Sequence, residues 1–195
     1  MIAIVVAAIV VVSVVGIYFY LTRPLKEYSV SFEDGWDDWE AQGIDLNDPP
    51  VNWTIERTDD HSDDGDYSMK LYLNNMNDQG KIWVQKSFDM DSDTGYKVKL
   101  RFSFASSDFG SFNLWKIIAG AGPKEPSSMD ELTFHGNTGN GYMEDVGYKW
   151  LDKEYTLNAR SNSDGELYVY IGVWGTWETG RTYYIDNIDI AVSLM

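Results

Sequence analysis

From Tyr28 onward, short runs of alternating apolar and polar residues are separated by clusters of glycine, aspartate, asparagine and serine. Side chains in a β-strand alternate between its two faces, so such runs predict strands, and pairs such as Asp34-Gly35 and Asp164-Gly165 predict the turns between them. The predicted strands are Tyr28–Glu33, Val51–Arg57, Tyr67–Leu73, Lys81–Phe88, Tyr96–Ser106, Phe112–Ala119, Lys149–Ala159, Glu166–Trp174 and Arg181–Val192. About nine strands, with no helix-period segment after residue 27, favour an all-β sandwich of two antiparallel sheets.

The alternation also separates the core face of a strand from its outer face. In Tyr96–Ser106 the outer positions are basic and include Arg101, whereas in Glu166–Trp174 they are aromatic. These outer aromatic residues are Tyr168, Tyr170 and Trp174. Trp and Tyr rings stack on the apolar faces of sugars and also serve protein contacts. If both faces lie on one sheet, the surface combines stacking with hydrogen bonding.

Trp115, in the predicted strand Phe112–Ala119, joins the aromatic candidates. For each ring there is a simpler interpretation, which is packing in the core or at the edge of the sandwich. In a filament, the same rings would also serve contacts between subunits.

Composition excludes several classes of function. Lys plus Arg number 15 against 31 Asp plus Glu, so the net charge is −16, which argues against nucleic acid as a partner because phosphate binding requires basic residues. Cysteine is absent, which excludes disulfides and thiolate metal sites. His61 and His135 are the two histidines, too few for a multi-histidine metal centre. No serine lies in a nucleophile-elbow motif, and we expect no enzymatic activity.

Residues 2–22 form an uncharged apolar run that ends just before Arg23 and Pro24. As a helix rising about 1.5 Å per residue, this run is long enough to cross a bilayer. A cleaved secretory signal fits poorly, because the run lacks a basic start and a small-residue cleavage site. A plain membrane anchor would, by the positive-inside rule, place the domain in the cytoplasm. This conflicts with the extracellular character of the domain described below.

A third interpretation is that a short basic leader was removed directly before Met1. The run then resembles the stem helix of mature type IV pilins and archaellins, although it lacks the acidic residue that many bacterial pilins carry near the start of the helix. Residues 1–27 are then a hydrophobic helix followed by a short linker. The resemblance implies that this helix polymerises after passing through the membrane, with Ile4, Val11 and Val15 among the packing positions. Residues 28–195 form the head. Filament stem and plain anchor both stay open.

The head resembles a carbohydrate-binding-module jelly roll of the galactose-binding-like type. The likeness rests on four segments in order, which are Phe32-Glu33-Asp34-Gly35, Asp64-Gly65-Asp66-Tyr67, Gly95-Tyr96-Lys97-Val98 and Tyr184-Ile185-Asp186-Asn187. The resemblance implies a jelly-roll fold, a possible glycan ligand and a structural calcium ion between the first and last strands. The fold alone implies little about function, because it also hosts adhesins and structural subunits.

Acidic loops are the candidate calcium ligands. Residues 58–66 read TDDHSDDGD, and carboxylates in a glycine-bearing loop suit a cation that takes six to eight oxygen ligands. With the resemblance, this points to a set made of Glu33, Asp60, Asp64 and Asp186. The simpler interpretation is that these acids are solvated turn residues.

Together these observations predict a structural subunit of an extracellular, pilus-like filament with an acidic head. The alternative is a membrane-anchored, extracytoplasmic carbohydrate-binding module or adhesin. The expected partners are further copies of the chain, the membrane before assembly and surface glycans.

Overall fold

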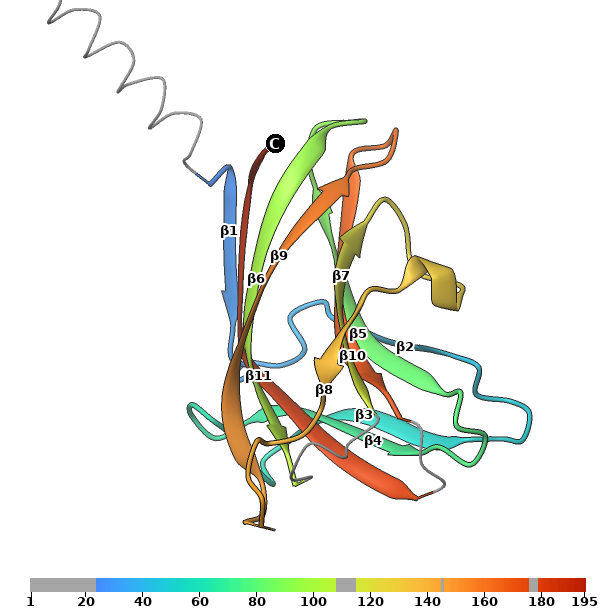
Figure 1. The fold of residues 1–195 in the computed structure, drawn as a ribbon. Helices are drawn as coiled ribbons and strands as arrows, with labels where there is room; N and C mark the ends of the chain where they lie inside the picture. The colour runs from blue at the N-terminus through green and yellow to red at the C-terminus, as the bar shows by residue number, and fades with distance from the viewer. Residues whose placement is uncertain (1–23, 108–114, 145, 176–178) are drawn as a thin grey trace, which may run out of the picture.

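A computed structural model describes residues 24–107, 115–144, 146–175 and 179–195, which form a two-sheet antiparallel β-sandwich (Figure 1). The strands are β1 (Lys26–Val30), β2 (Glu40–Ile44), β3 (Asn52–Thr58), β4 (Ser68–Asn74), β5 (Lys81–Asp89), β6 (Gly95–Ser106), β7 (Lys116–Gly122), β8 (Phe134–Asn137), β9 (Lys149–Arg160), β10 (Glu166–Trp174) and β11 (Gly180–Leu194). A single 3₁₀ turn, η1 (Met129–Glu131), lies between β7 and β8 in the described chain.

The strands are divided between two sheets that face each other. Sheet A has six strands in the order β3-β4-β11-β6-β9, with β1 also pairing with β11. Sheet B has five strands in the order β2-β5-β10-β7-β8. In the long strand β11, one part pairs with β4 and a later part pairs with β1, so the first and last strands of the head lie side by side.

The core lies between the sheets and is built from the apolar faces that the alternation predicts. On β6 these residues are Val98, Leu100, Phe102 and Phe104, and on β10 they are Leu167, Val169, Ile171 and Val173. None of these eight side chains is more than 2% exposed. Burial of this apolar surface is the main force that holds the two sheets together.

Most predicted strands are confirmed, and two short ones are missed. β2 reads EAQGI and β8 reads FHGN, and neither has the apolar alternation by which strands are recognised. β7 begins at Lys116, while the predicted start at Phe112 lies outside the described residues. The outer faces of β6 and β10 belong to different sheets, so Arg101 and the β10 aromatics lie on opposite sides of the sandwich.

Positions 1–23 of the predicted N-terminal helix lie outside the described residues. They include Ile4, Val11 and Val15. Lys26 and Glu27, which the prediction assigned to the linker, belong to β1. Within the part of the chain that the structure describes, no helix has the length and apolar character needed to span a membrane.

Candidate functional site

The outer face of sheet B carries a line of aromatic and polar side chains. β5 and β10 are paired so that Lys81 faces Trp174, Gln85 faces Tyr170 and Ser87 faces Tyr168. The alternate positions of the two strands therefore form adjacent columns on the side away from the core. This face has three parts, which are a polar cluster around Trp174, a covered centre and a pocket beside Tyr168.

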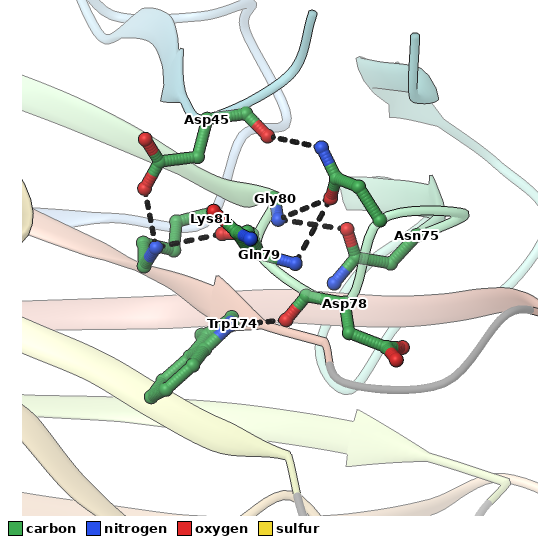
Figure 2. Close-up of polar contacts among 8 residues, drawn as sticks. Asp45, Asn75, Asp78, Gln79, Gly80, Lys81 and Trp174 are labelled. Carbon is green, nitrogen blue, oxygen red and sulfur yellow. Dashed lines mark hydrogen bonds and ion pairs between the residues drawn. The ribbon is translucent and has the colours of Figure 1, made fainter. Parts of the chain in front are cut away.

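At the first end, the Trp174 indole is fixed by polar contacts (Figure 2). Its Nε1 donates a hydrogen bond to the carbonyl oxygen of Asp78 at 3.1 Å, and the Lys81 ammonium lies 5.0 Å from the ring centroid. Lys81 is only 2% exposed and is neutralised by Asp45, with Nζ 2.5 Å from Oδ2. A buried ammonium needs such a partner. Trp174 therefore stays partly accessible, but its N–H is already used within the protein.

The turn that carries Asp78 is held by asparagine side chains. The Oδ1 of Asn75 accepts a hydrogen bond from the Gly80 N–H at 2.8 Å (Figure 2), and the Oδ1 of Asn77 accepts one from the Gln79 N–H at 2.9 Å. Asn77 also donates to the carbonyl oxygen of Asp45 at 2.8 Å. Asparagine is favoured in turns because its side chain can replace backbone partners in this way.

The centre of the face is covered by the segment 123–133. Trp83 and Tyr170 pack with Ile118 and Leu132 in a second apolar cluster, and the Tyr170 ring is 2% exposed. The Tyr170 hydroxyl donates to the carbonyl oxygen of Glu131 at 2.9 Å. This corrects the expectation that Tyr170 contacts a ligand. Alternation correctly places the ring outside the main core, but it does not reveal that a later loop folds over it.

At the other end, Tyr168 borders a pocket of about 150 Å³. The lining residues are Asp38, Glu40, Gln85, Lys86, Ser87, Glu125 and Tyr168. They come from β5, β10, the segment 38–40 at the entry to β2 and the loop after β7, so the fold brings together four separate parts of the chain. Of the predicted ligand-binding residues, Tyr168 is the one that the structure places in this pocket.

Gln85 is the most unusual residue of this pocket. Its side chain is 1% exposed, and its Oε1 accepts a hydrogen bond from the indole Nε1 of Trp83 at 3.1 Å. Because an indole N–H can only donate, this contact fixes which end of the amide is oxygen. The Nε2 group is left without a hydrogen-bond partner among the described residues. Buried donors are rarely unpaired, so Gln85 Nε2 needs a water or a ligand.

The pocket has a negative electrostatic character. Burial, reinforced by the nearby carboxylates of Glu166 and Glu125, raises the pKa of Tyr168. The Lys86 ammonium is held by the Asp37 carbonyl oxygen and lies 3.7 Å from the Asp38 carboxylate. The sequence contains a signal for this site that the prediction did not use. In the apolar strand Lys81–Phe88, alternation puts Gln85 on the outer face beside Trp83.

The other two predicted ligand residues lie elsewhere. Trp115 is 3% exposed and is covered by the Arg181 guanidinium, 4.6 Å from its ring centroid, so the expectation of an accessible ring is corrected. Arg101 is exposed on the outer face of sheet A, where its Nε lies 3.0 Å from Oε2 of Glu154. Neither residue reaches the pocket on sheet B.

The predicted calcium ligands fasten the loop 59–66 to the sandwich. Asp186 is fully buried, and its Oδ2 accepts hydrogen bonds from the backbone N–H groups of Asp63 and Asp64 at 2.9 and 3.2 Å. Its Oδ1 accepts a further one from Asn187 at 2.8 Å. Glu33 accepts hydrogen bonds from the backbone N–H groups of Asp66 and Tyr67 at 3.1 and 2.9 Å.

In this structure the predicted ligands are used for other contacts. The carboxylates of Glu33 and Asp186 accept hydrogen bonds from backbone N–H groups, and Asp60 is paired with Lys70 at 2.5 Å. Among the described residues, no group of three or more His, Asp or Glu side chains is placed to hold a metal. The sequence analysis correctly groups Glu33 and Asp186 with the loop 59–66. In the structure both carboxylates accept backbone hydrogen bonds there. Calcium binding by this chain stays a prediction.

The same loop carries His61, for which we predict a pH effect. The ring stacks on Trp150, with 5.3 Å between centroids, and burial lowers the pKa of His61 although Asp63 opposes the shift. The unfolded chain therefore binds this proton at a higher pH than the folded chain, and stability falls as the pH drops below about 6.5. We expect the melting temperature to drop more between about pH 7 and about pH 5 for the wild type than for His61→Gln. Equal falls would contradict this account of His61.

Comparison with known proteins identifies the fold. No protein-family model matches the sequence, and no curated protein matches it either. The K3 cleaved adhesin domain of Lys-gingipain from Porphyromonas gingivalis is 12% identical, with a TM-score of 0.51 over 85% of this chain and 98% of that chain. This likeness confirms the two-sheet sandwich and concerns the fold alone.

Two carbohydrate-binding modules are also similar. The CBM22-1 xylan-binding domain of Paenibacillus barcinonensis Xyn10C is 12% identical and gives a TM-score of 0.47 over 89% of this chain and 99% of that chain. TmCBM61, solved with β-1,4-galactotriose, is 15% identical and gives a TM-score of 0.44 over 85% of this chain and 94% of that chain.

Proposed function

We propose that residues 28–195 are an extracytoplasmic glycan-binding head, of the carbohydrate-binding-module or adhesin kind, carried on residues 2–22 as a membrane anchor. The observation that supports this function best is the pocket on the outer face of sheet B, where a tyrosine ring and a buried, unpaired amide lie together. The proposal assigns binding to this site and no catalysis.

The chemistry of the pocket suits a sugar. A pyranose ring presents an apolar face, which the Tyr168 ring can cover, and a rim of hydroxyl groups. The Gln85 Nε2 can donate to a hydroxyl oxygen, and the carboxylates of Glu40 and Glu125 can accept from hydroxyl groups. The covered centre separates this pocket from Trp174, so the proposed contact is at the Tyr168 end.

A glycan array, followed by titration calorimetry of the best ligand, tests the proposal. The full chain is kept in a polyoxyethylene detergent, because maltoside headgroups are themselves glycans. We expect Tyr168→Ala to weaken binding about tenfold, because it removes the stacking ring. Tyr142→Ala is the matched control, since Tyr142 is 46% exposed on a loop outside the pocket. A chain that binds no glycan, or a Tyr168→Ala variant that binds like the wild type, would contradict the proposal.

A filament subunit is the second candidate, and it rests on the uncharged run of residues 2–22. Electron microscopy and mass spectrometry of material sheared from the producing cells separate the two. Filaments that contain the chain, intact from Met1, would make the apolar run an assembly element. A chain that stays in the membrane pellet, with no filaments present, would make it an anchor only.

A further inference from the structure

The geometry points to a ligand class for the pocket beside Tyr168, namely a glycan residue that bears a free ammonium group, as an amino sugar does. The inference rests on the proposed function and adds the chemistry that the pocket selects. Three observations carry it, which are the unbalanced carboxylates, the buried amide donor and the open tyrosine ring.

The first observation is the charge of the lining. It contains three carboxylates against one ammonium, that of Lys86, which is already shared between Asp37 and Asp38. Glu40 and Glu125 are exposed at the rim, and the carboxylate of neither makes a hydrogen bond or an ion pair with another described residue, although the backbone of Glu40 pairs with Gln85 of β5. Two carboxylates without a cation favour a positive ligand and repel a uronate or sulfated sugar.

The second observation is independent of charge. The Gln85 amide is 1% exposed, its oxygen is used by Trp83, and its Nε2 has no partner among the described residues. This group needs an oxygen acceptor, which a simple amine does not supply but a sugar hydroxyl does. A ligand that brings both a positive group and hydroxyl oxygens would meet the charge of the lining and the need of this donor together.

The third observation is the ring. Tyr168 lies at the pocket wall and is only partly buried, so part of its side chain is accessible to a ligand. An aromatic face attracts a cation as well as the C–H face of a sugar. An amino sugar can stack on the ring, pair its ammonium group with the carboxylates and accept a hydrogen bond from the amide.

Oligomers of equal length supply the direct test with the full chain in polyoxyethylene detergent. At about pH 6, below the ordinary pKa of an amino group, glucosamine oligomers carry charge and N-acetylglucosamine oligomers do not. We expect the dissociation constant of the charged oligomer to be about tenfold lower, with the difference removed at about 0.5 M NaCl. Galacturonate oligomers should bind most weakly. Oligolysine that binds as tightly as the glucosamine oligomer would show plain charge attraction and overturn the inference.

Variants locate the effect. Glu40→Gln with Glu125→Gln should weaken binding of the glucosamine oligomer about tenfold and leave the N-acetylated oligomer unchanged. Glu27→Gln with Glu144→Gln removes the same charge from exposed positions outside the pocket and should change neither. Equal binding of both oligomers, with loss on Tyr168→Ala, would overturn the inference and leave the proposed function standing. Failure of every oligosaccharide to bind would contradict both.

Discussion

Replacement of Asp186 by alanine is expected to lower the free energy of unfolding by about 3 kcal/mol. The carboxylate is fully buried and accepts three backbone hydrogen bonds, two of them from the loop 59–66. Alanine would remove the acceptor of these three N–H groups at a fully buried side-chain position, and an unmet buried donor costs more than the hydrogen bond itself contributes. Urea unfolding followed by tryptophan fluorescence measures the loss.

Two controls separate the hydrogen bonds from other causes. Asp189→Ala removes an exposed carboxylate from the same strand and should change stability by less than about 0.5 kcal/mol. If hydrogen bonds alone hold these carboxylates, EDTA leaves the melting temperature of the wild type unchanged. A melting temperature that falls with EDTA and returns with calcium would support the predicted metal site and contradict the hydrogen-bond account.

Replacement of Tyr170 by alanine is expected to cost about 4 kcal/mol of stability, as is usual when a buried aromatic ring is removed from a packed cluster. The ring is 2% exposed between Trp83, Ile118 and Leu132. Tyr170→Phe keeps the ring and loses the hydrogen bond to Glu131, so its cost should be about 1 kcal/mol. Both values are measured by urea unfolding.

Tyr168→Ala is the matched variant for this prediction, since it removes the same ring two positions away on the same face. It should leave stability within about 1 kcal/mol and weaken glycan binding. A Tyr170→Ala variant with wild-type stability and impaired glycan binding would mean that the segment 123–133 does not cover the ring, and that Tyr170 contacts the ligand after all.

The sequence predicts strands well in this chain, because most strands have one apolar face and alternate clearly. β10 is predicted with its exact bounds, and β6 begins at Gly95, one residue before the predicted start. β2 and β8 are missed, because one is polar with a glycine and the other has four residues. β2 pairs with β5 and β8 pairs with β7, so in both cases the neighbouring strand stabilises a strand that its own sequence does not predict.

The site is predicted less completely, because alternation gives the face of a residue and not its neighbours. It places Tyr168 and Tyr170 on one face, yet only the structure shows that one borders a pocket and the other lies under a loop. The sequence of a strand does not show which sheet it joins, so it leaves open whether Arg101 shares a surface with Tyr168. Gln85 gave a usable signal, as a polar residue within an apolar strand.

A crystal structure of the head with its best-binding glycan tests the central claim most directly. The account predicts a sugar ring against Tyr168 on the outer face of sheet B, with a sugar oxygen within hydrogen-bond distance of Gln85 Nε2. A sugar bound on the outer face of sheet A, beside Arg101, would contradict it, as would a sugar that leaves the Gln85 amide unpaired.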